Sequence, residues 1–303
     1  MASWKEIKRR IKSIKNTSKI TKAMELISTV KMKKAQDAVI SKKDYMRWIL
    51  EVFLKVSDSL WESNFFSQKE WGKTLWVLVT SNKWLCWGYN INVMKKVSQY
   101  MKQNNEKIDF VTLWKRGSQF IARTGNSIVA DYSNDFSDNI SYSFSKSISK
   151  SITKQFLSGE YSNVRVFYSH YVNTIKQVPV SRMFLPLTKV WIENYFKQVF
   201  GDEYYNEKQK LLQWETHQTY TIEPSKEELL KHIVPMILDS MFYDILLESK
   251  ASEHASRMIA MKNAKDNANK FASKLTLAYN KARQAWITKE VSEIVSGVES
   301  MKD

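Results

Sequence analysis

The sequence predicts an α/β protein in which a long antiparallel coiled coil of N- and C-terminal helices carries an inserted, mainly parallel, doubly wound α/β domain. Two observations predict this architecture. Both ends of the chain contain long stretches without glycine, residues 4–60 and 225–296, whereas the middle alternates short apolar runs with amphipathic segments. The expected division is a coiled-coil shaft of residues 1–60 and 224–303, an α/β foot domain of residues 72–200 and a connection over residues 201–223.

The N-terminal stretch has the spacing and charge of a basic amphipathic helix running to about Leu60. Apolar residues recur there mostly at intervals of three or four: Ile7, Ile11, Ile14, Met24, Ile27 and Val30. Residues 1–60 also contain fifteen Lys and Arg against six Asp and Glu, a net charge of +9. Such a helix can bind nucleic acid, an anionic membrane surface or an acidic protein, and charge alone does not choose among them.

The middle of the chain predicts strands that alternate with helices. The expected strands are residues 74–81, 107–114, 126–131, 164–171 and 178–187, with helices over 91–103 and 117–122. The serine-rich residues 133–158 resemble a linker, but Phe144, Ile148, Ile152 and Phe156 lie four apart and favour a helix. This alternation is typical of a mainly parallel sheet with helices on its faces. Residues 201–223 are polar and poorly patterned, as expected of a connection.

The C-terminal stretch predicts one helix, roughly 100 Å long, which is too long for a core element of a compact domain. Ser225, with Glu228 three residues later, is typical of a helix N-cap, and Pro235 should kink or delay the first turns. Alanines recur mostly four apart from Ala251 to Ala285. Small side chains on one face allow a second helix to approach closely, which favours pairing with the N-terminal helix.

No motif for chemistry is present in the sequence. It lacks a Gly-rich nucleotide-binding fingerprint and an HExxH motif, and Cys86 is the only cysteine. We therefore expect no catalytic, cofactor-binding or metal-binding residues and no enzymatic activity of the chain itself. Because no apolar run approaches the ~20 residues that span a bilayer, and because the N-terminus lacks the apolar core of a signal peptide, we expect membrane association only through partners.

Four segments closely resemble the gamma subunit of F-type ATP synthases. They are KEIKRRIKSIKNTSKITKAMELISTVKMKKAQ, SNKWLCWGYN, QVPVSRMFLPL and LLESKASEHASRMIAMKNAKDNANKFASKLTLAYNKARQAWITKEVSEIVSG. The resemblance implies a non-catalytic rotor that couples ion-driven rotation of a membrane ring to ATP synthesis. Its implied partners are the α and β subunits of the catalytic head, the epsilon subunit and the c-subunit ring. The implied location is the cytoplasmic side of a bacterial plasma membrane, as a peripheral subunit.

The resemblance also implies partner-binding residues: Met24, Arg257, Arg283, Gln284, Thr288 and Glu290. Arg283 and Gln284 match a pair that contacts a catch loop of the β subunit, with the next two residues close by on the same helix. Met24 matches a position near an acidic lever segment of β, and Arg257 matches a polar contact lower on the shaft. The alternative for each is an ordinary solvated position of a coiled coil.

Two other functions compete with the rotor. The net charge of the N-terminal helix motivates a basic nucleic-acid-binding coiled coil, but no reading module or set of stacking aromatic residues accompanies it. We therefore expect no nucleic-acid partner. An enzyme of the doubly wound class is the third possibility, and nucleotide binding by the isolated chain would favour it.

The tryptophans depart from the resembled family. The chain has 11 tryptophans and 7 glycines, whereas average usage gives about twenty glycines. Trp84, Trp87 and Trp114 stand where the family has glycine, and Trp4 and Trp286 replace small residues. We expect UGA codons that the source reads as glycine, with Trp84 and Trp87 at positive φ or in a displaced turn and their rings partly in solvent. The alternative is true tryptophans that fill a divergent core.

Overall fold

A computed structural model describes residues 4–56, 65–66, 72–103, 107–134, 140–214, 225–299 and 301. The chain divides into two compact units. We call Met1–Val30 with Arg257–Asp303 the shaft unit, and Lys31–Ser256 the foot unit. The two longest helices, α1 (Trp4–Ser41) and α8 (Lys226–Glu299), each contribute residues to both units.

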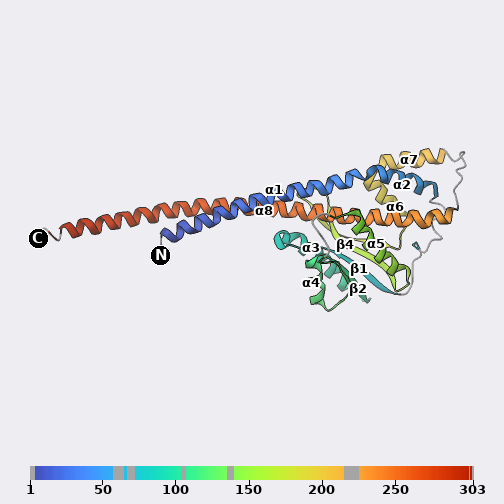
Figure 1. The fold of residues 1–303 in the computed structure, drawn as a ribbon, viewed down its shortest axis with the longest axis horizontal. Coiled ribbons are helices and arrows are strands. Elements are labelled where there is room, and N and C mark those ends of the chain that lie inside the picture. The colour runs from blue at the N-terminus through green and yellow to red at the C-terminus, as the bar shows by residue number, and fades with distance from the viewer. Residues whose placement is uncertain are drawn as a thin grey trace. The chain divides into compact units, whose positions relative to one another are not determined.

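In the shaft unit α1 and α8 form the predicted antiparallel pair (Figure 1). Ser18 Oγ donates to Asn269 Oδ1 at 2.7 Å, and Lys265 Nζ contacts Glu25 Oε2 at 2.8 Å. The numbers rise on one helix as they fall on the other, which establishes the antiparallel direction. The alanine stripe faces inward only in part: Ala272 is buried while its neighbour Phe271 is 60% exposed, but Ala278 and Ala285 are exposed.

The N-terminal segment is two helices, so the expectation of one unbroken helix to Leu60 is wrong. α1 ends at Ser41, α2 (Lys43–Val56) follows, and residues 57–64 lie outside the described part of the chain. The break is held by Lys42, whose Nζ donates to the Ser240 carbonyl of α8 at 3.0 Å. The sequence around this break contains neither glycine nor proline. The break therefore has no local sequence signal and coincides with a contact to a distant part of the chain.

The foot unit is built on a five-stranded sheet in the order β3-β2-β1-β4-β5. The strands are β1 (Lys73–Val79), β2 (Ile108–Leu113), β3 (Ser127–Asp131), β4 (Tyr161–Tyr171) and β5 (Gln177–Leu185). β1 to β4 are parallel to one another, and β5 pairs antiparallel with β4. The prediction of a mainly parallel sheet is confirmed.

Helices cover both faces of this sheet, as a doubly wound domain requires (Figure 1). The helices following the strands are α3 (Trp87–Gln103), α4 (Lys115–Thr124), α5 (Tyr142–Leu157) and α6 (Lys189–Phe200). Alternate residues of β1 point to opposite faces. Trp76 and Leu78 pack in the core beneath α3 and α4, and Leu75 and Val77 pack in the larger core that includes residues of α2, α5, α6 and α8.

The connection before α8 contains a helix that the polar sequence did not predict. α7 (Asp202–Trp214) follows α6 and buries Tyr205, which is 1% exposed, in the larger core. Residues 215–224 lie outside the described part of the chain. α8 begins as predicted, since Glu228 N donates to Ser225 Oγ at 3.2 Å, and it continues through Pro235.

The tryptophan positions behave differently from one another. Trp87 has an ordinary helical φ of −56°, and Trp84 begins the 3-10 turn η2 (Trp84–Cys86). Neither residue has positive φ, so the first of the two expected conformations is wrong, and a displaced turn stays a prediction. Trp87 is 64% exposed, as expected. Trp114, by contrast, has φ 72° and is buried.

Candidate partner-binding surface

The six predicted partner-binding residues all belong to the shaft unit. Arg283, Gln284, Thr288 and Glu290 lie on the last turns of α8, and all four are exposed. The Thr288 hydroxyl donates to the Gln284 carbonyl one turn earlier at 3.0 Å. The Arg283 guanidinium lies 5.9 Å from the centre of the Tyr279 ring. These contacts are local, which leaves the polar ends of the four side chains available to another molecule.

An apolar stripe continues from these polar residues toward the C-terminus. Ile287, Val291, Ile294 and Val298 follow one another at intervals of four, three and four, which places them on one face of α8. All four are about half exposed or more, between 46% and 62%. At about 100° per residue, Arg283 and Gln284 fall on the same face as this stripe. Apolar surface of this extent on a helix indicates a site for another protein.

In the part of the chain that the structure describes, the end of α8 carries this surface without a second helix beside it. The first described residue of α1, Trp4, has its ring 6.0 Å from that of Trp286 and 6.1 Å from that of Tyr279. In the shaft unit, residues 287–299 therefore extend past the N-terminal end of the described part of α1, as Figure 1 shows. A single helix offers a different side-chain surface in every direction.

Met24 and Arg257 lie apart from this group. About 26 residues of α8 separate Arg257 from Arg283, or roughly 40 Å along the helix. The Arg257 side chain is largely buried, with 6% of the residue exposed. Met24 is half-buried on α1. It precedes Glu25, whose hydrogen bond to Lys265 raises the pKa of that lysine. The structure therefore distributes the predicted residues along a rod and does not gather them into one site.

α1 carries a second exposed apolar face, which the apolar spacing of the sequence did not predict. Ile27 and Val30, which belong to the apolar spacing of the sequence, are 54% and 68% exposed, and Ile20 is 61% exposed. The buried residues of this part of α1 are the small Thr21 and Ser28. Ser28 Oγ donates to the Met24 carbonyl at 2.7 Å, so its polar group is satisfied within the helix. Small residues are thus the buried ones in this part of α1, and the larger apolar side chains of Ile20 and Ile27 are exposed.

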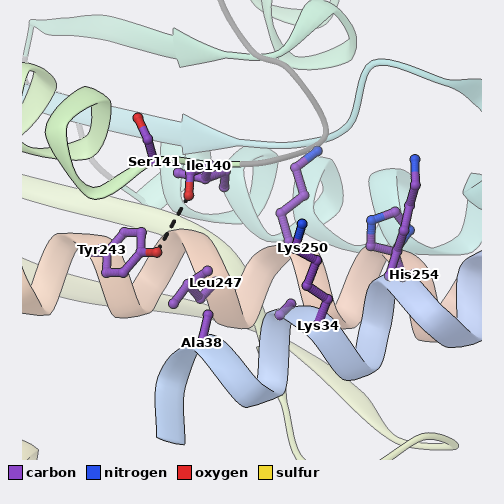
Figure 2. Close-up of a pocket in the computed structure, with 10 residues that line it drawn as sticks. Lys34, Ala38, Ile140, Ser141, Tyr243, Leu247, Lys250 and His254 are labelled. Carbon is purple, nitrogen blue, oxygen red and sulfur yellow. Dashed lines mark hydrogen bonds between the residues drawn. The ribbon is translucent and has the colours of Figure 1, made fainter. Parts of the chain in front are cut away.

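The foot unit contains a hollow of about 290 Å³ lined by residues of α1, α8 and the start of α5 (Figure 2). The hydroxyl groups drawn there serve the fold. Tyr243 Oη donates to the Ile140 carbonyl at 3.4 Å, and Ser141 Oγ accepts from Phe144 N as the N-cap of α5. Lys250 is buried and pairs with Glu253 at 3.0 Å. Within the described ranges, no group of three or more His, Cys, Asp or Glu side chains could hold a metal ion.

The structure offers no described helix that is long and apolar enough to cross a membrane. On geometry alone, the strongest candidate surface is the exposed face at the end of α8.

Comparison with known proteins shows the family and the fold of the chain. The family model described as ATP synthase matches residues 3–301. The chain is 34% identical over 304 residues to the ATP synthase gamma chain of Pelotomaculum thermopropionicum and 35% identical over 303 residues to that of Akkermansia muciniphila, with all of both chains covered. Among solved structures, it is similar to a chain of the Tetrahymena thermophila mitochondrial ATP synthase central stalk and c-ring. The TM-score is 0.57 and the identity 25%, covering 81% of this chain and 99% of that one. A chain of the Euglena gracilis mitochondrial enzyme shares the fold, with a TM-score of 0.63, 16% identity and coverage of 98% and 94%.

Proposed function

Because the chain belongs to the ATP synthase gamma chain family, we propose that its exposed α8 face transmits torque between a membrane ring and the catalytic head. The protein is a central stalk subunit of ATP synthase and is not itself catalytic. The competing interpretation as a nucleic-acid-binding coiled coil has no support from these relatives. The observation that carries the torque proposal is the apolar and polar face of residues 283–298, which extends past the described part of α1.

The proposed mechanism depends on asymmetry. A single off-centre helix contacts three chemically identical catalytic subunits through different side chains at any one angle. Each subunit then has a different preferred conformation and a different nucleotide affinity, and rotation of the shaft exchanges these preferences in turn. Such a part needs stiffness and an uneven surface. The long pair of helices supplies the stiffness, and the one-sided apolar stripe on α8 supplies the uneven surface.

We assign the partner contacts by their exposure. Arg283, Gln284, Thr288 and Glu290 are proposed to form hydrogen bonds and ion pairs with a β-subunit loop, since all four are exposed. Met24 would lie in a second contact, with the apolar face of α1 around it and the basic charge of residues 1–60 directed to an acidic β-subunit segment. Arg257 stays a predicted contact, although a partner would reach only the edge of its buried side chain.

The wider assembly is proposed on the same basis. Residues 1–60 and 224–303 would form the shaft inside a ring of α and β subunits. Residues 72–200 would form a foot that contacts the epsilon subunit and the c-subunit ring, with residues 201–223 as the connection. The subunit is peripheral, and we propose the cytoplasmic side of a bacterial plasma membrane as its location, with attachment only through these partners.

The test is a pair of substitutions on opposite faces of one helix. In a complex reconstituted with α and β subunits, Arg283→Ala with Gln284→Ala should lower coupled ATP synthesis by roughly tenfold, which corresponds to about 1.4 kcal/mol. Lys289→Ala is the matched control, because Lys289 is exposed on the opposite face and pairs with Glu293 at 3.5 Å. Equal activity of the double variant and the control would refute the proposed contact.

A further inference from the structure

Trp114 has a backbone conformation that side chains rarely adopt. It lies between β2 and α4 with φ 72° and ψ 150°. It is the sole non-glycine residue with positive φ in the described part of the chain. This region of the Ramachandran plot is essentially restricted to glycine, because a Cβ atom there collides with the neighbouring backbone.

The turn cannot relax to relieve this conformation, because hydrogen bonds fix it from a second strand end. Three successive residues after Trp114 donate from their backbone to the three residues that follow β1. The bonds are Lys115 N to Asn82 Oδ1 at 3.0 Å, Arg116 N to Ser81 O at 3.2 Å and Gly117 N to Thr80 Oγ1 at 2.8 Å. Thr80 N also donates to the Leu113 carbonyl at 3.3 Å. Residues on both sides of position 114 are therefore held in place.

Gly117, three residues after Trp114, shows how tightly this turn is packed. A Cβ added to Gly117 would lie 3.0 Å from Thr80 Oγ1 and 3.2 Å from Leu78 Cγ. α4 thus approaches β1 so closely that a side chain at position 117 would clash. A rotation of the backbone at Trp114 would have to move α4 from this position.

The side chain of Trp114 does not cap the helix that begins at this turn. Trp114 is the N-cap residue of α4, and its side chain accepts no capping hydrogen bond. N-cap positions favour Ser, Thr, Asp, Asn and Gly, because they either cap the helix or cost little in this conformation. The indole is buried, and Lys250 Nζ lies 4.0 Å from its ring centre, beside the buried Lys250–Glu253 ion pair.

We propose that residue 114 is glycine in the protein as its source makes it, encoded by a UGA codon that the source reads as glycine. Glycine satisfies the φ and ψ of this turn without strain, and it is among the favoured N-cap residues. The composition of the chain, with 11 tryptophans and 7 glycines, has the imbalance that such decoding produces when UGA is read as tryptophan. The proposal rests on the conformation of residue 114 and is independent of the assigned rotor function.

Mass spectrometry of the protein purified from its source tests the proposal directly. Trypsin releases residue 114 in the peptide Ile108–Lys115, which should be lighter than its tryptophan form by the indole side chain. The control is the peptide Thr74–Lys83, which contains Trp76. Trp76 is buried in β1, with its ring centre 5.7 Å from that of Phe110 and 4.8 Å from that of Phe167, and it should remain tryptophan. A tryptophan mass at position 114 would overturn the proposal.

A second measurement uses recombinant full-length chains. Trp114→Gly should lower the midpoint of thermal unfolding by about 2–6 °C less than Trp76→Gly does, because relief of the backbone strain at position 114 offsets part of the packing lost with the buried indole. Trp114→Ala should lower the midpoint more than Trp114→Gly, since alanine keeps the Cβ atom and therefore the strain at φ 72°. Trp76→Gly should lower the midpoint, because it opens a cavity among aromatic rings. If Trp114→Gly lowered the midpoint as much as Trp76→Gly, the indole would be a true core residue and the proposal would fail.

Discussion

Lys42 lies between α1 and α2, and groups of α8 hold its side chain. Its Nζ donates to the Ser240 carbonyl at 3.0 Å, pairs with the Asp244 carboxylate and lies 5.5 Å from the centre of the Tyr243 ring. Tyr195 donates to the same carboxylate. Burial lowers the pKa of Lys42 and raises that of Asp244. The pair therefore compensates two desolvated charges, and losing either partner leaves the other uncompensated.

Removing one member of this pair should destabilise the foot unit strongly. Lys42→Met should lower the free energy of unfolding by about 3–5 kcal/mol, because Asp244 would stay buried without its counter-ion. Lys42→Met with Asp244→Leu should cost much less than the two single changes added together. Lys208→Met is the control, since the Lys208–Glu51 pair is partly exposed and is worth about 1 kcal/mol or less. Urea unfolding of the full chain measures all four, and additive single effects would contradict this account.

Tyr205 makes stability depend on alkaline pH. Burial in the larger core raises the pKa of Tyr205 to about 12. Because the folded pKa lies above the unfolded value of 10.0, the folded state keeps its proton longer. The contribution of this proton to stability is complete below pH 10 and is lost as pH rises toward 12.

The expected loss for Tyr205 is about 2 kcal/mol between pH 10 and 12. Tyr205→Phe should remove that part of the pH dependence and change stability little at pH 7. Chemical unfolding at pH 8 and pH 11 measures both values. An unchanged alkaline slope in Tyr205→Phe would show that the phenol does not ionise on unfolding in this range.

At the scale of elements, the two ends of α8 serve different purposes. In the foot unit its residues are buried, including Ile237, Leu238 and Phe242, so the helix is part of a core. Past Ala272 nearly every residue is half-buried or exposed, and the helix carries a surface. One continuous helix can do both because helical hydrogen bonds are satisfied within the backbone and need no surrounding core.

Deleting residues 291–303 tests the role of the C-terminal end of α8. The deletion removes Val291, Ile294 and Val298 from the apolar stripe but leaves the helix pair and the foot unit intact. In complexes purified with α and β subunits, we expect lower torque in a single-molecule rotation assay and unchanged co-purification. Substituting serine at these three positions should lower torque in the same direction while keeping the helix length. Complete loss of assembly on deletion would mean that the anchoring contacts lie in the stripe itself.

At the scale of the whole molecule, the chain has a mechanical role and no catalytic one. The described residues provide two long helices, a sheet covered by further helices, and exposed faces, while a formal charge of +16 is carried mainly on the surface. A central stalk subunit needs these properties, because its effect on nucleotide affinity depends on which surface meets which partner. The absence of a chemical motif in the sequence therefore agrees with a non-catalytic member of the gamma chain family.

Local pattern by itself determined the main elements of this protein. Glycine-free stretches with helical spacing predicted α1 and α8, and short apolar runs predicted the strands, because both periods are properties of neighbouring residues. Only the tertiary structure decided the break at Lys42, the helix α7, the outward direction of Ile27 and the positive φ of Trp114. Each of these depends on a contact with a distant part of the chain, such as Asp244 for Lys42, and no local spacing records such a contact. The partner residues around Arg283 came from resemblance, since an exposed polar side chain on a helix has the same local pattern with or without a partner.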